Sequence, residues 1–218
     1  MDAIVLAGGF ARRMGELVRD PPKQLLPVGG EPLLAHVLRS LEAVAPDRVL
    51  IAVNAAFASQ FDAFITSYDG PLQVELAVEQ ARSEGEKPGA LGALGQLVEA
   101  RRLAGPLFVA GGDNLFDFDL GRLARLHKAT GDDIIALYDV QSRELAQLYG
   151  IATLEDGVIV DFVEKPPDPR STLAATACWL LSPGGVSALE DFLGCGGQRD
   201  ALGHFLAWRS SRATVRGI

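Results

Sequence analysis

The chain opens with Asp2-Ala3-Ile4-Val5-Leu6-Ala7-Gly8-Gly9, a short and almost continuous apolar run that ends at two glycines. Such a run is typical of a β-strand buried on both faces of a parallel sheet. The glycines that follow allow the backbone to turn tightly where the strand ends. We therefore expect a buried strand at the start of the chain, leading directly into a glycine turn.

The rest of the first half alternates strand patterns with helix patterns. Between residues 31 and 44, apolar residues recur at steps of three and four, which predicts an amphipathic helix. Further apolar runs of strand length occur at 49–53, 74–78, 107–110 and 134–138, and helical patterns occur near 55–65, 90–101 and 120–128. Alternation of this kind predicts an α/β fold, with a mixed but mostly parallel sheet flanked by helices.

The pattern changes after about residue 145. Apolar runs at 149–154 and 158–164 flank Glu155-Asp156-Gly157, whose Asp-Gly pair is a strong signal for a β-hairpin turn. A third run at 176–181 and helical segments near 184–192 and 200–208 complete the chain. The sequence contains no internal repeat, low-complexity segment or linker, so we expect residues 1–218 to form a single domain.

Charge and hydropathy exclude several classes of partner. The net charge is -8 and no stripe of lysine and arginine offsets it, so we expect no nucleic-acid partner. An anionic small substrate is still compatible with this total, because a few cations in a cleft can outweigh it locally. The chain has no long apolar run and no signal-peptide pattern, so we expect a cytoplasmic protein without membrane contacts. Cys178 and Cys195 have neither metal-ligand nor redox spacing, and we expect buried thiols without a disulfide.

Three segments carry residues suited to phosphate chemistry. In the glycine turn, backbone amides could approach phosphate oxygens while Arg13 clamps two of them. The proline-stiffened loop 19–28 presents Lys23 as a point charge. The run 107–114 delivers Asp113 at the carboxyl end of a buried strand, where one carboxylate plus substrate phosphates would suit Mg²⁺. Taken alone, each segment has an ordinary structural explanation as a turn, a surface charge or a helix N-cap.

Together, these segments resemble the sugar-phosphate nucleotidylyltransferases, in particular the glucose-1-phosphate thymidylyltransferases. The family opens with Leu-Ala-Gly-Gly-x-Gly-Thr-Arg-Leu, matched by residues 6–14 with Arg13 at the arginine. Its Pro-Lys-x-Leu-Leu-Pro-Val element is matched by residues 22–28, and its Gly-Asp-Asn by residues 112–114. The resemblance implies a Rossmann-like nucleotide-diphospho-sugar transferase fold, with a nucleotide-binding half at 1–140 and a sugar-binding half at 141–218.

The resemblance also implies a role for each matched residue. Arg13 and Lys23 would be catalytic, holding the pyrophosphate and the reacting phosphates, and Asp113 and Asp200 would bind Mg²⁺. The other matched positions divide between the two substrates: nucleotide contacts would come from Leu6, Ala7, Gly8, Gly9, Gln80 and Gly89, and sugar-phosphate contacts from Tyr149, Gly150, Glu164, Lys165 and Thr176.

The implied reaction transfers a nucleoside monophosphate from a nucleoside triphosphate to a sugar 1-phosphate, with Mg²⁺ as cofactor and release of pyrophosphate. The residues around Lys23 and Asp113 favour dTTP or UTP as the donor, and the resemblance implies glucose 1-phosphate as the acceptor. Two alternatives stay open: transfer to another phosphorylated acceptor such as phosphocholine, and a regulatory subunit of the same fold without catalysis. Self-association into a homo-oligomer is also left open.

The chain departs from the family pattern at three places. Ala11 replaces the glycine of the opening motif and Arg12 its threonine, and alanine lacks the access of glycine to positive φ. The chain ends at Ile218, before the Trp-x-Asp-x-Gly-Thr segment of the family, which indicates either a short member or a clipped chain. We also expect no feedback site of the kind that C-terminal extensions form in some members.

Overall fold

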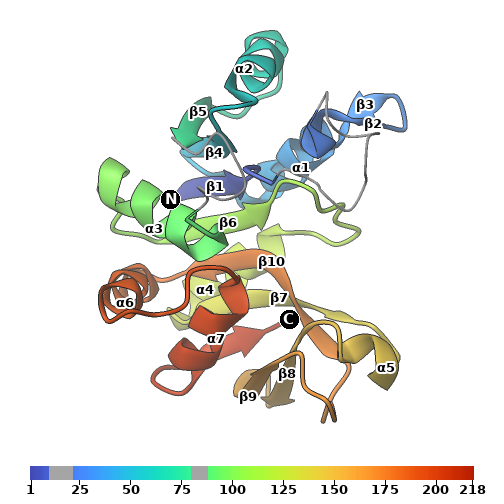
Figure 1. The fold of residues 1–218 in the computed structure, drawn as a ribbon, viewed down its shortest axis with the longest axis vertical. Helices are drawn as coiled ribbons and strands as arrows, with labels where there is room; N and C mark the ends of the chain where they lie inside the picture. The colour runs from blue at the N-terminus through green and yellow to red at the C-terminus, as the bar shows by residue number, and fades with distance from the viewer. Residues whose placement is uncertain (10–21, 80–87) are drawn as a thin grey trace.

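The computed structural model describes residues 1–9, 22–79 and 88–218, which form a layered α/β protein (Figure 1). The strands are β1 (Asp2–Leu6), β2 (Pro27–Val28), β3 (Glu31–Pro32), β4 (Arg48–Asn54), β5 (Val74–Glu79), β6 (Leu107–Gly111), β7 (Asp133–Asp139), β8 (Gly150–Glu155), β9 (Val158–Glu164), β10 (Leu173–Leu181) and β11 (Val215–Gly217). The helices are α1 (Leu33–Leu41), α2 (Ala58–Ser67), α3 (Ala90–Arg101), α4 (Gly121–Thr130), α5 (Arg143–Ala146), α6 (Pro183–Gly194) and α7 (Leu202–Ser210), with 3₁₀ turns η2 (Lys23–Leu25) and η3 (Glu42–Val44).

Nine of the described strands form one mixed sheet, in the order β5-β4-β1-β6-β10-β7-β11-β9-β8. β5, β4, β1 and β6 run parallel to one another. β10 is antiparallel to β6 and β7 and also pairs with β8, which forms a hairpin with β9. The predicted α/β fold is therefore confirmed, and β10 joins its parallel part to its antiparallel part.

Alternate side chains of β1 enter two separate cores, one on each face of the sheet. Ala3 and Val5 pack with side chains of α1, α2 and α4, whereas Ile4 packs with those of α3, α6 and α7. Helices α3, α6 and α7 contact one another, and Figure 1 shows them gathered on the same side of the molecule. Burial on both faces explains why β1 is a continuous apolar run. Among the helices that the structure describes, none is long and apolar enough to cross a membrane.

The structure confirms the longer elements that the sequence predicts and adds short ones. The helix predicted at 31–44 forms as α1 followed by η3, and the predicted hairpin forms from β8 and β9. Asp156 and Gly157 in its turn have φ values of 49° and 77°, which fits the preference for Asp-Gly in such turns. The sequence patterns missed α5, β11 and the β2-β3 pair, because segments of two to four residues are too short to show a period.

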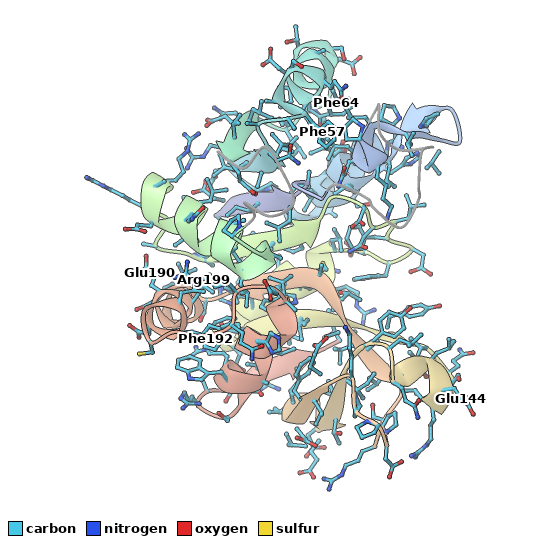
Figure 2. All side chains as sticks on the ribbon, in the orientation of Figure 1. Phe57, Phe64, Glu144, Glu190, Phe192 and Arg199 are labelled. Atoms are coloured by element: carbon cyan, nitrogen blue, oxygen red, sulfur yellow. The ribbon has the colours of Figure 1, made fainter. Side chains whose placement is uncertain are left out.

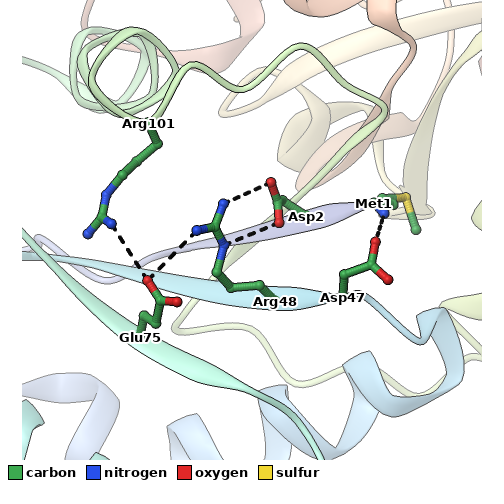
Figure 3. Close-up of polar contacts among 6 residues, drawn as sticks. All are labelled: Met1, Asp2, Asp47, Arg48, Glu75 and Arg101. Carbon is green, nitrogen blue, oxygen red and sulfur yellow. Dashed lines mark hydrogen bonds and ion pairs between the residues drawn. The ribbon is translucent and has the colours of Figure 1, made fainter.

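Ion pairs connect the amino-terminal ends of β1, β4 and β5 (Figure 3). Arg48 donates from Nε and Nη2 to the two carboxylate oxygens of Asp2, at 3.3 and 3.1 Å. Its Nη1 also lies 3.9 Å from Glu75, which Arg101 of α3 approaches at 3.6 Å. These contacts join α3 to the amino-terminal ends of three neighbouring strands, at the opposite end of β1 from Gly8 and Gly9.

Candidate active site

A hollow of about 530 Å³ lies at the carboxyl ends of β1, β5 and β6, which is where open α/β sheets place their ligand sites. The described residues in its wall fall into two groups. Those predicted to bind nucleotide or metal are Leu6, Gly8, Gly9, Gly89, Asp113 and Asp200. The others are Gln24, Glu79, Pro88, Ala90 and Ala93.

The neighbouring strand β4 holds the backbone of Ala7 and Gly8, where the predicted glycine turn begins. The Ala7 amide donates to the Ala52 carbonyl at 2.8 Å, and the side-chain amide of Asn54 donates to the Gly8 carbonyl at 3.2 Å. Asn54 is 1% exposed, and its Oδ1 accepts the Ala56 amide at 3.0 Å. Replacing a buried, hydrogen-bonded amide leaves its partners unsatisfied. Asn54 is thus a positioning residue that the sequence argument missed, although a polar residue ending a buried strand is a signal for one.

Lys23 and Asp113 form an ion pair beside the hollow. Lys23 begins η2, directly after Pro22, and its Nζ donates to Oδ2 of Asp113 at 2.8 Å. Asp113 follows β6, where the Gly112 amide donates to the Leu6 carbonyl at 2.9 Å and so ties this turn to β1. The side chains of Lys23 and Asp113 are 34% and 44% exposed, so a ligand can reach both. The structure therefore brings together the predicted catalytic lysine and a predicted metal ligand.

Gln24 is a buried polar residue in the wall of the hollow. It is 3% exposed, and its Oε1 has no hydrogen-bond partner among the described residues. A buried acceptor without a partner costs about 1–3 kcal/mol. An N–H or O–H group of a ligand that reached Oε1 would therefore be favoured. In the sequence, Gln24 belongs to the motif around Lys23 that favours dTTP or UTP, and no ligand contact is predicted for its own side chain.

Gly89 and Asp200 meet at the start of α3. Gly89 has a φ of +77°, and a Cβ at this position would lie 2.2 Å from the Arg199 carbonyl oxygen. The amides of Ala90 and Leu91 donate to the carbonyls of Asp200 and Arg199 at 3.3 and 3.0 Å, so residues 199–200 satisfy the first turn of the helix. Arg199, labelled in Figure 2, consequently lies against α3. These contacts set Asp200 in the wall of the hollow, and they require glycine at position 89.

Asp113 and Asp200, the two predicted metal ligands, carry side chains of the type that Mg²⁺ prefers. Both line the same hollow, and Mg²⁺ binds through one or two carboxylates together with water and substrate phosphates. In residues 1–9, 22–79 and 88–218, no cluster of three or more His, Cys, Asp or Glu side chains is arranged to hold a metal ion. The metal-binding role of the two acids stays a prediction.

Four of the residues predicted to bind the sugar phosphate lie where β8 begins and β9 ends. Gly150 pairs with Glu164 across the two strands, and the Lys165 amide donates to the Tyr149 carbonyl at 2.9 Å. The Glu164 carboxylate lies close to two glycines, because a Cβ on Gly150 or Gly203 would lie 2.7 or 2.2 Å from its Oε2. Lys165 has a φ of +49°, which is uncommon for a residue other than glycine.

Thr176, the fifth predicted sugar-site residue, lies on β10. Its hydroxyl donates to the Ala136 carbonyl at 2.7 Å. Together with Asn114 and Tyr149, it lines a second hollow of about 750 Å³, whose wall also contains Leu115, Phe116, Phe118, Tyr138 and Ile218. The Thr176 hydroxyl already satisfies a backbone carbonyl, so its contribution to sugar binding stays a prediction.

Two predicted site residues, Arg13 and Gln80, lie outside the described residues. Their roles in binding pyrophosphate and reading the base stay predictions. The same holds for the effect of Ala11 and Arg12 on the glycine-rich loop. The side chain of Ala7 is 1% exposed and packs in the core, so contact with a nucleotide could involve only its backbone.

Comparison with known proteins finds a family and several relatives. The family described as "Nucleotidyl transferase" matches residues 2–194. The chain is 27% identical over 195 residues to "Mannose-1-phosphate guanylyltransferase 1" of Arabidopsis thaliana, covering 87% of this chain and 52% of that protein. It is 27% identical over 185 residues to "UTP--glucose-1-phosphate uridylyltransferase AglF" of Haloferax volcanii, covering 84% of this chain and 72% of that protein. The chain thus spans about half the length of the guanylyltransferases that it matches.

Solved structures share the fold over nearly the whole chain. A putative glucose-1-phosphate thymidylyltransferase from Bacillus anthracis, in complex with a sucrose, has a TM-score of 0.85 at 21% identity, covering 100% of this chain and 86% of that one. An apo UDP-glucose pyrophosphorylase has a TM-score of 0.82 at 21% identity, covering 99% and 89%. At these identities, the likeness establishes the arrangement of strands and helices.

Proposed function

Because the chain belongs to the nucleotidyl transferase family, we propose that it transfers a nucleoside monophosphate from a nucleoside triphosphate to a sugar 1-phosphate, releasing pyrophosphate. The observation that carries this proposal is the Lys23–Asp113 ion pair, 2.8 Å long, beside the hollow that the glycine turn lines. When two phosphates must react, positioning and charge neutralisation supply most of the catalysis. A lysine, two acids and a glycine turn at one edge of the sheet provide both.

In the proposed reaction, an oxygen of the sugar phosphate attacks the α-phosphorus of the triphosphate, and the bond to pyrophosphate breaks on the opposite side. The attacking and leaving oxygens are already ionised, so the protein needs no general base. Lys23 turns from Asp113 to the phosphate oxygens and offsets the repulsion between the two anions. Mg²⁺, which Asp113 and Asp200 would hold, supplies further neutralisation of phosphate charge. Arg13 is the proposed ligand of the departing pyrophosphate.

The nucleotide is proposed to occupy the 530 Å³ hollow. Gly8, Gly9 and Gly89 carry no side chain that would keep a ligand away from the backbone. Asn54 holds the first of these glycines through its carbonyl, so the backbone of Gly8 is positioned without a ligand. When a site needs little rearrangement, less of the binding free energy is lost in ordering the protein around the ligand.

The sugar phosphate is proposed to bind next to β8 and β9. The Glu164 carboxylate is suited to accept hydrogen bonds from sugar hydroxyls, and the Lys165 ammonium to bind the phosphate. The positive φ of Lys165, 49°, is a local strain that the Tyr149–Lys165 backbone hydrogen bond helps to maintain. Such strain is concentrated at functional positions. It supports a role for Lys165 in substrate binding.

The proposal extends to the class of acceptor. The sequence favours glucose 1-phosphate with dTTP or UTP. The names of the relatives combine guanylyl transfer with mannose 1-phosphate and UTP with glucose 1-phosphate. Each of these acceptors is a hexose 1-phosphate, and we propose a hexose 1-phosphate as the acceptor of this chain, with Mg²⁺ as its cofactor.

A matrix of substrate pairs tests the proposed function. The protein would be incubated with Mg²⁺, each nucleoside triphosphate in turn and a panel of hexose 1-phosphates, and pyrophosphate release would be measured. We expect release for at least one pair, with loss of activity after addition of EDTA. Asp113→Asn should nearly abolish turnover, whereas Asp62→Asn, an exposed acid on α2, should not.

Two outcomes would overturn the proposal. If no pair releases pyrophosphate, the chain does not catalyse this reaction, and a regulatory role or a different acceptor such as phosphocholine must be tested. If Asp113→Asn retains activity close to that of the wild type, Asp113 is not part of the metal site. Circular dichroism of the variant distinguishes loss of activity from loss of fold.

A further inference from the structure

Glu79 is a carboxylate in the wall of the nucleotide hollow that neither the motifs nor the proposed mechanism uses. It is the last residue of β5, where it pairs with Asn54 of β4, and its carbonyl accepts the Ala55 amide at 3.0 Å. Asn54 in turn holds the Gly8 carbonyl. Gly8, Asn54 and Glu79 therefore follow one another across three adjacent strands at the carboxyl edge of the sheet.

The side chain of Glu79 turns toward the glycine turn. Its Oε1 and Oε2 lie 3.1 and 3.4 Å from the position that a Cβ on Gly8 would occupy. Both residues line the hollow, so the carboxylate stands where the missing side chain of Gly8 leaves room. Residue 79 immediately precedes Gln80, which the family resemblance assigns to base reading. The geometry thus places a carboxylate in the wall of the hollow that is proposed to hold the nucleotide.

The remaining wall suits a flat ring with hydrogen-bond donors on its edge. Among the lining residues that the structure describes, Pro88, Gly89, Ala90 and Ala93 are small or apolar. The buried Oε1 of Gln24, which has no partner among the described residues, is a further acceptor in the same wall. An ionised carboxylate can only accept hydrogen bonds. The side-chain groups identified here therefore favour a base that donates.

Guanine is the common nucleobase that presents two adjacent donors, N1–H and the N2 amino group. A carboxylate with two oxygens can accept both in parallel, which is a strong and directional arrangement. Uracil and thymine present a single N3–H between two carbonyl oxygens, and adenine and cytosine present an amino group beside an unprotonated ring nitrogen. With those bases, one carboxylate oxygen would face another acceptor and lose its hydrogen bond.

We propose that Glu79 selects a guanine nucleoside triphosphate as the nucleotide donor. This inference deepens the proposed function, on which it rests, by naming the donor base. It differs from the dTTP or UTP that the motif wording around Lys23 and Asp113 favours. The physical reason is that the motifs contact phosphate, whereas discrimination between bases depends on groups facing the edge of the base.

Binding of each nucleoside triphosphate, measured by isothermal titration calorimetry with Mg²⁺ and without an acceptor, tests the assignment. We expect the dissociation constant for GTP to be lower than those for ATP, CTP, UTP and dTTP by about tenfold or more. Glu79→Gln replaces one acceptor oxygen by an amide donor, which matches the N3–H and neighbouring carbonyl of uracil and thymine. This variant should lose the preference for GTP and bind UTP or dTTP more tightly than the wild type does.

Glu99→Gln provides a matched control, because Glu99 is exposed near the far end of α3. It should keep the nucleotide preference of the wild type. Equal or tighter binding of UTP or dTTP by the wild type would overturn the inference, and so would a Glu79→Gln variant that keeps the preference for GTP. Pyrophosphate release with any donor tests the proposed function separately. A chain that prefers GTP but releases no pyrophosphate would contradict only the proposed nucleotidyl transfer. Efficient transfer from dTTP together with weak binding of GTP would contradict only the selection of guanine by Glu79.

Discussion

Replacing Lys23 with methionine should separate catalysis from stability in this protein. The side chains of Lys23 and Asp113 are 34% and 44% exposed, so their ion pair contributes at most about 1 kcal/mol to folding. The same charge placed against reacting phosphates has a larger effect, because loss of one preorganised electrostatic contact in an active site lowers kcat by about 10²- to 10³-fold. We expect Lys23→Met to lower kcat/KM by at least about 100-fold while the unfolding free energy changes by less than about 1 kcal/mol.

The two effects are measured on the same preparation, by pyrophosphate release with the best substrate pair and by urea unfolding. Methionine keeps much of the length of the lysine side chain, so the apolar contacts of the stem are largely retained. Lys128→Met, at an exposed position on α4, is the control and should change neither quantity. If kcat/KM stays within about threefold of the wild type, Lys23 does not act on the transition state. If stability falls by more than about 2 kcal/mol, the ion pair is mainly structural.

Three further predictions concern packing and burial. Gly89→Ala should lower the unfolding free energy by about 1–3 kcal/mol or more, because φ is +77° and the new Cβ would lie 2.2 Å from a backbone carbonyl oxygen. Gly194→Ala, where a Cβ meets open space, is its control, and equal effects in urea unfolding would contradict the steric argument. Asp133→Ala should lower the unfolding free energy by about 3–5 kcal/mol in the same assay. The Asp133 carboxylate is 2% exposed and accepts hydrogen bonds at 2.6–2.7 Å from Ser182 and Arg209. A loss below about 1 kcal/mol would show that these hydrogen bonds do not stabilise the fold. Burial raises the pKa of Cys178 to about 12, whereas Cys195 is exposed, so the expectation that both thiols are buried is wrong for Cys195. Only Cys195 should therefore be alkylated quickly in the native protein at about pH 8, and two fast thiols would refute the burial of Cys178. Because the unfolded thiol ionises at lower pH, the stability linked to Cys178 is present below pH 9.0 and is lost as the pH rises toward 12.

Several elements could be predicted because their cause is local. The run at β1 is apolar throughout because Ile4 faces one core and Val5 the other, and burial on both faces leaves a direct mark in sequence. The bounds of α3, Ala90–Arg101, match the predicted helical pattern for a similar reason. In contrast, β11 spans only Val215–Gly217 and forms because β7 and β9 accept it, which no local period can indicate.

The sequence by itself determined the fold class, because its apolar runs and helical periods are local. It also predicted phosphate chemistry from Gly8 and Asp113, which follow buried strands, and from Lys23 in a proline-stiffened loop. Only the tertiary structure decided which groups meet: Lys23 with Asp113, and Gly8 with Asn54 and Glu79. These contacts depend on the register between strands and loops that are far apart in the chain. Register is set by pairing across the sheet, and a shift of one residue would turn the side chains of Asn54 on β4 and Glu79 on β5 to the opposite face.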